Sequence, residues 1–83
     1  MEYLIVRFPE TREVRVDGVP QGKTNFILQF EAGLHDVTLE PPMNFSPVEQ
    51  KVLLKNTAAL DPCQIEFHLL PPSAIPISPG SPS

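Results

Sequence analysis

Tryptophan is absent from this chain, and tyrosine and cysteine occur once each. The single cysteine, Cys63, excludes an internal disulfide and a cysteine-based metal site. Six Lys and Arg against ten Asp and Glu give a net charge of −4. A chain with this charge lacks the basic surface that nucleic-acid binding requires. No apolar run approaches the roughly 20 residues that span a bilayer. We therefore expect a protein that neither binds nucleic acid nor inserts into a membrane.

The start of the chain does not resemble a signal peptide, because residues 1–8 carry an acid rather than a basic cluster and their apolar stretch is short. A cytoplasmic location is the default expectation. An envelope-associated location is the alternative if the sequence is part of a longer protein.

Proline is plentiful, and five of the eleven prolines fall after position 70. All sixteen charged residues lie before position 71. The chain therefore divides into one domain, residues 1–70, and an uncharged Pro/Ser-rich segment, residues 71–83. That segment has little apolar surface to bury, so we expect it to be flexible or extended.

Apolar and polar residues alternate along the domain, the period-two pattern of strands with one buried face. The pattern predicts about six strands, at residues 4–8, 14–16, 24–30, 35–40, 48–54 and 63–69. Short strands separated by turns about every ten residues indicate an antiparallel sandwich or barrel, an all-β fold. The fifth segment is assigned to a strand because Val48, Val52 and Leu54 share a strand face and form no helical stripe.

The inward side chains of these strands form the expected core: Leu4, Val6, Phe8, Val14, Val16, Phe26, Leu28, Phe30, Val37, Leu39, Val52, Leu54, Ile65, Phe67 and Leu69. Between the strands, Asp17 and Gly18 predict a tight reversal, since glycine tolerates positive φ and aspartate bonds its own backbone. Gly22 and Gly33 are further structural turn residues.

Three motifs follow one another in the first half of the chain: Val14-Arg15-Val16-Asp17-Gly18, then Gly22-Lys23-Thr24, then Glu-Ala-Gly-Leu-His-Asp-Val-Thr-Leu at residues 31–39. Together, over Val14 to Pro47, they resemble the PEGA domain family. Its pattern is a strand ending in Val-Asp-Gly, a loop to Gly-x-Thr, an apolar strand and a Gly-x-His-x-Val strand. The chain departs from it with Asn44-Phe45 in place of a Gly-Tyr-like pair, and with Asn25 where proline is frequent.

The resemblance implies a small antiparallel β-sandwich of immunoglobulin-like or prealbumin-like shape. Domains of this family are found mostly in bacteria and archaea, often repeated or attached to other domains of envelope proteins. The resemblance further implies a binding or spacer module without catalytic residues of its own.

Residues with reactive or ligating side chains are few and scattered. His35 with Asp36, or His68 with Glu66, supplies two ligands, fewer than a zinc site needs. We expect the His35 ring at the sheet rim, bonded to a turn carbonyl. Cys63 has no predicted base or helix N-terminus beside it and is expected to be structural.

Phosphate and acyl-transfer motifs are also missing. Gly18 and Gly22 are one residue too close for the phosphate-loop spacing, although Lys23 and Thr24 follow, and no helix is predicted there. No serine lies in a nucleophile elbow. The sequence therefore predicts no enzyme, no metal and no cofactor.

These observations favour a non-enzymatic protein-interaction or spacer module that binds an unknown protein or a second copy of itself. Two surfaces are expected: an unprotected sheet edge that accepts an added strand, and the proline-bounded loop of residues 41–47. The candidate binding residues of this loop are Met43, Asn44 and Phe45, with Met43 and Phe45 as an exposed apolar tip.

The alternative is a module that binds a carbohydrate or another cell-envelope ligand through the outward face of residues 35–40. Asp36, Thr38 and Glu40 project from that face in the predicted strand. Exposed aromatic residues gathered on one face would favour this alternative.

Overall fold

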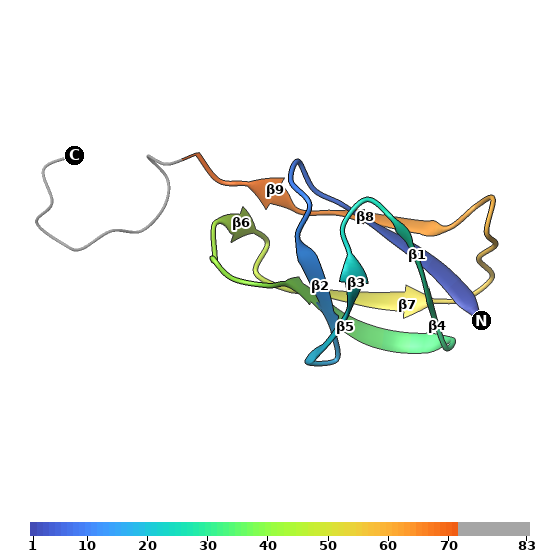
Figure 1. The fold of residues 1–83 in the computed structure, drawn as a ribbon. Helices are drawn as coiled ribbons and strands as arrows, with labels where there is room; N and C mark the ends of the chain where they lie inside the picture. Colours follow the sequence, from blue (N-terminus) through green and yellow to red (C-terminus); the bar gives the residue numbers. More distant parts are fainter. Residues whose placement is uncertain (72–83) are drawn as a thin grey trace, which may run out of the picture.

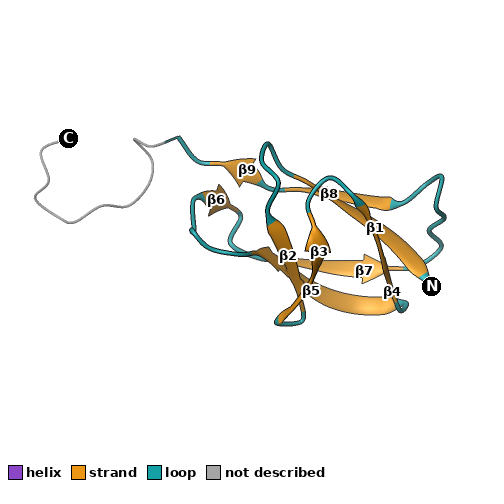
Figure 2. Cartoon of the chain, in the orientation of Figure 1, coloured by secondary structure: helices purple, strands orange, loops and turns teal. Residues whose placement is uncertain are grey.

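The computed structural model of the chain describes residues 1–71 (Figure 1). It contains nine strands: β1 (Glu2–Arg7), β2 (Glu13–Val16), β3 (Val19–Lys23), β4 (Ile27–Phe30), β5 (Gly33–Leu39), β6 (Phe45–Ser46), β7 (Gln50–Leu54), β8 (Cys63–Glu66) and β9 (His68–Leu69). Residues 1–71 include no helix (Figure 2). The predicted all-β class is confirmed, and the Pro/Ser-rich segment lies, apart from Pro71, outside the described residues.

Two larger sheets share one apolar core and form a sandwich. One sheet has the strand order β4-β1-β8 and the other β3-β2-β5-β7, while β6 and β9 form a short third sheet. Every pair is antiparallel except β1 with β8, which is parallel. Parallel neighbours need a long crossover connection, and here the rest of the domain provides it. The sandwich is therefore not antiparallel throughout.

The reversal predicted at Asp17 and Gly18 joins β2 to β3. Their φ angles are 53° and 83°, the two positive values of a type I′ turn, whose twist matches that of the flanking strands. Asp17 also accepts a hydrogen bond from the backbone N–H of Asp36 through Oδ1, at 2.9 Å. The turn is thereby fixed to β5 as well as to β2.

Strand β3 is a strand that the sequence pattern did not predict. Pro20 lies within it, which is compatible with pairing because β3 is an edge strand. The register with β2 shifts by one residue in this hairpin. Gly22 has φ of 146°, and a Cβ added there would lie 2.5 Å from Leu28 Cδ2. The positive φ therefore favours glycine at this position, and the end of the Leu28 side chain would have to move to admit a Cβ.

Most of the predicted core is present. Inward residues of both large sheets and three phenylalanines outside them form one buried cluster: Leu4, Val6, Phe8, Val14, Val16, Phe30, Val37, Leu39, Phe45, Val52, Leu54 and Phe67. Leu28, Cys63 and Ile65 pack against this cluster and are partly buried. Ile5, which was not in the expected core, is also buried, and it pairs with Ile27 on β4 and Gln64 on β8.

Two residues of the expected core, Phe26 and Leu69, are exposed, and so is Val48, which was predicted to share a strand face with Val52 and Leu54. Phe26 is 61% exposed, because Asn25 has φ of 68° and β4 begins only at Ile27. Val48 is exposed because the strand was predicted to start at this residue, whereas β7 begins only at Gln50. Leu69 is also exposed, since the chain leaves β8 at Phe67 and pairs anew with β6.

Replacing Phe67 by alanine tests the position of the core. Phe67 is buried and meets the Phe45 ring edge-on, with 5.7 Å between ring centroids. We expect Phe67→Ala to lower the free energy of unfolding by about 3–5 kcal/mol in urea titrations. Phe26→Ala is the matched control, with an expected loss of less than about 0.5 kcal/mol. Equal losses would contradict the placement of Phe26 in a turn.

Candidate functional site

The loop of residues 41–47 is anchored to the domain and does not form an apolar tip. Phe45 is 3% exposed, and its ring packs edge-on against Phe8 and Phe67 at centroid distances of 6.3 and 5.7 Å. Asn44 is half-buried, which leaves Met43 as the one exposed residue of the three candidates. The prediction that Phe45 is an exposed binding residue is wrong, because β6 turns its ring into the core.

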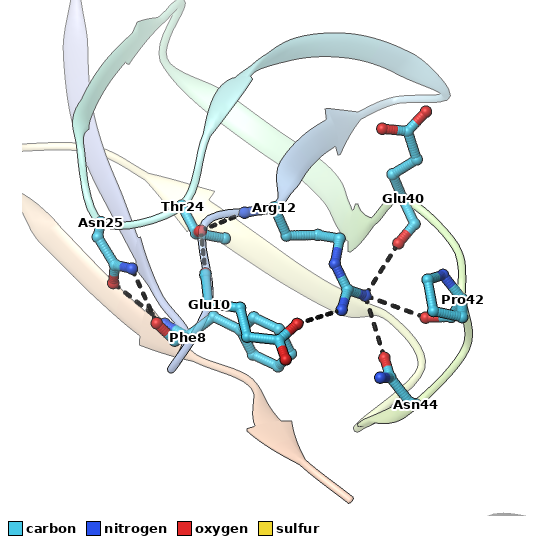
Figure 3. A network of polar contacts seen from close by, with 8 residues as sticks. All are labelled: Phe8, Glu10, Arg12, Thr24, Asn25, Glu40, Pro42 and Asn44. Carbon is cyan, nitrogen blue, oxygen red and sulfur yellow. Dashed lines mark hydrogen bonds and ion pairs between the residues drawn. The ribbon is translucent and has the colours of Figure 1, made fainter.

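Arg12 holds this loop in place (Figure 3). Its Nη1 donates hydrogen bonds to two oxygens of the loop, the Pro42 carbonyl at 3.0 Å and Asn44 Oδ1 at 3.1 Å, and to the Glu40 carbonyl just before the loop at 3.2 Å. Its Nη2 lies 2.6 Å from Glu10 Oε1, and the guanidinium lies over the Phe8 ring. The Arg12 side chain is only 11% exposed, whereas its contacts to Pro42 and Glu10 lie at the surface. The sequence analysis did not predict the contacts of Arg12 with this loop.

Thr24 and Asn25 continue the same network toward β1 (Figure 3). The buried Thr24 hydroxyl accepts a hydrogen bond from Arg12 N and donates one to Glu10 O, at 2.8 and 2.7 Å. The Asn25 side chain donates to Phe8 O at 2.8 Å and accepts from Phe8 N at 3.2 Å. These bonds join the β1–β2 connection to the corner between β3 and β4. The buried polar side-chain atoms of this network all have hydrogen-bond partners, so we interpret the network as structural.

His35 lies where β5 meets the β2–β3 turn. Its Nδ1 is 2.8 Å from Asp17 Oδ2 and its Nε2 is 2.8 Å from Glu31 O, which confirms the predicted bond to a turn carbonyl. A neutral imidazole has one N–H and the cation has two, so two acceptors favour the cation. The Asp17 carboxylate, followed by the Glu31 carbonyl, raises the pKa of His35 above 6.5. Hydrogen bonds from Asp36 N and then His35 lower the pKa of Asp17 below 3.8.

The outward face of β5 is occupied by contacts within the domain. Asp36 pairs with Lys51 at 3.0 Å, and the Thr38 hydroxyl donates to Val48 O at 2.6 Å. Glu40 lies 3.7 Å from the Arg15 guanidinium. Within residues 1–71, no three metal-binding side chains gather at one point. His68 and Glu66 are both exposed, and no third ligand joins them.

An exposed apolar pair stands beside the outer edge of the four-stranded sheet. Leu34 on β5 and Leu53 on β7 lie directly opposite each other, and they are 64% and 55% exposed. Strand β7 pairs with β5 on one side and with no described strand on the other. We refer to the free side of β7 together with Leu34 and Leu53 as the β7 edge.

The other sheet edges differ from the β7 edge. Pro20 and the register shift protect β3 from strand addition. The outward residues Gln64 and Glu66 make β8 polar. On β4, Ile27 is exposed but faces the buried Ile5. Among these edges, only the β7 edge sets two exposed apolar residues opposite each other.

A comparison with protein-family models, curated proteins and solved structures finds no match for this chain. The described part of the chain has no helix of the length and apolarity that a membrane crossing needs. The PEGA resemblance therefore stays a prediction from the motif residues.

Replacing Arg12 by alanine tests whether it anchors the loop. We expect Arg12→Ala to lower the free energy of unfolding by about 2–3 kcal/mol, because it removes the charged donor that joins Glu40 O, Pro42 O and Asn44 Oδ1. Arg15→Ala, which breaks a 3.7 Å contact on a more exposed side chain, is the control and should cost less than about 1 kcal/mol. Urea unfolding measures both, and similar losses would remove the distinction between the two arginines.

The His35 contacts predict a pH-dependent stability. Because the folded pKa lies above 6.5, the stabilisation is fully present below this pH and is lost as the pH rises through the folded value. We expect the difference in unfolding free energy between the wild type and His35→Gln to shrink across this range. Urea titrations at several pH values measure the difference. A difference that does not change with pH would show that His35 is not a cation in the fold.

Proposed function

We propose that this domain is a non-enzymatic protein-interaction module that binds an extended segment of a partner at the β7 edge. The segment would add as a new strand, through main-chain hydrogen bonds to β7. The exposed Leu34–Leu53 pair beside an unpaired edge is the observation that carries this proposal.

The chemistry of the β7 edge suits such a ligand. Val52 and Leu54 face the core, which fixes the pleat of β7 and leaves Lys51 and Leu53 on the outward face. A residue of the added strand placed beside Leu53 would gain contact with an apolar side chain that is already half-exposed. Full burial of such a leucine is worth about 1.5–3 kcal/mol. The preferred ligand is therefore an extended peptide with alternating apolar residues.

The PEGA-like character of the domain is part of the same proposal. Two residues of the resembling motifs, Asp17 and His35, are bonded to each other in the fold, so the motifs form one structural unit. A cytoplasmic module, or one module of a longer envelope protein, fits this proposal. The carbohydrate-binding alternative has less support, since Phe26 is the only exposed aromatic side chain within residues 1–71.

Selection of peptides from a random display library tests the proposal. We expect the selected peptides to alternate in polarity and to shift the amide resonances of β7 in NMR titrations. Leu53→Lys should weaken their binding by about tenfold or more, roughly 1.4 kcal/mol. Phe26→Lys makes the same change at an exposed residue outside the β7 edge and should leave the affinity unchanged. Shifts confined to another surface would overturn the proposal.

A further inference from the structure

We propose that the β7 edge binds the β7 edge of a second copy of this chain. The two strands would run antiparallel about a two-fold axis that passes beside Val52. The two four-stranded sheets would then join into one continuous sheet. This inference rests on the proposed function, because it uses the same edge and names its partner.

Symmetry limits the ways in which β7 can pair with its own copy. Residues directly opposite each other in an antiparallel pair lie on the same face of the sheet. Since side chains alternate between the faces, an outward residue must face an outward residue of the second copy. Each allowed register is therefore centred on one residue of the strand, and a slip of one position would place core residues in solvent.

The outward residues along and beside β7 are Glu49, Lys51, Leu53 and Lys55, all of them exposed. In the register centred on Val52, Glu49 faces Lys55 of the second copy, and symmetry repeats this pair at the other end. Lys51 faces Leu53, so no like charges are opposed. Opposite charges at these positions stabilise an antiparallel pair, whereas like charges destabilise it.

The neighbouring registers lack this complementarity. A centre at Lys51 opposes the two copies of Lys51, and a centre at Leu53 opposes Lys51 to Lys55 twice. A centre at Gln50 brings Pro47 into the new ladder, where proline donates no hydrogen bond. A centre at Leu54 pairs Val52 with Asn56, whose φ of 57° departs from a strand. The Val52 register alone pairs the whole strand without such a conflict.

The same register extends the apolar pair across the interface. Leu34 and Leu53 of one copy would continue into the aliphatic stem of Lys51 of the other, since these residues fall in one cross-strand row. Lysine stems cover apolar surface while the ammonium stays in water. In each chain the Lys51 ammonium lies 3.0 Å from Asp36 on β5. The ammonium is therefore held on the side of β7 that faces away from the second copy. Leu53 thereby gains a neighbour from the second copy, while Leu34 stays beside Leu53.

Sedimentation equilibrium of the full chain, from about 5 µM to 1 mM, tests the inference. We expect a reversible dimer. Lys55→Glu places two carboxylates opposite each other at both ends and should raise the dimer Kd about tenfold or more. The double variant Glu49→Lys/Lys55→Glu restores opposite charges and should return Kd to within about threefold of the wild type. Lys23→Glu, the same charge change on β3, should leave Kd unchanged.

The outcomes separate this inference from the proposed function. A dimer weakened by Lys55→Glu and restored by the double variant supports the Val52 register. A dimer that ignores both changes, or that the double variant fails to restore, overturns it. A chain that stays monomeric while selected peptides still bind β7 also overturns it, and leaves the proposed function standing. A monomer that binds no peptide at β7 overturns both.

Discussion

Burial of alternate side chains between two sheets is the constraint on which the rest of this domain depends. Val37 on β5, with Val52 and Leu54 on β7, must face the core. Leu53, which lies between Val52 and Leu54, and its cross-strand partner Leu34 are left on the opposite face. The exposed leucine pair is thus a direct result of the pleat. Because the core of so short a chain is small, the sheet cannot twist these residues inward without losing others.

Beyond the ends of the strands, polar contacts hold the turns in place. Arg12, Thr24 and Asn25 bind backbone groups of the turns that surround the phenylalanine cluster. At the other end of the sheet, His35 and Asp17 join two turns to β5. The first network contains the Arg12–Glu10 ion pair, and the second contains the His35–Asp17 pair. Each end of the domain is therefore held by one ion pair together with hydrogen bonds to backbone groups.

The sequence predicts the regular part of the fold and misses what depends on turns. Alternation identified residues such as Val37 and Leu39 because both of their neighbours are polar. It failed at Phe26, where Asn25 adopts positive φ, and at Phe45, which a two-residue strand carries into the core. A sheet edge was expected as a surface, but strand order decides which edge is free. Leu34 and Leu53 are nineteen positions apart, and only the register brings them together.

The parallel pairing of β1 with β8 has a mechanical consequence. The chain enters β1 at one end of the body and leaves through β8 and β9 at the opposite end (Figure 1). Tension applied along the chain would pull these neighbouring strands in opposite directions along their length. Their hydrogen bonds would then be loaded in shear, together and not one after another. A domain linked in series through both termini would resist extension at this ladder before any other.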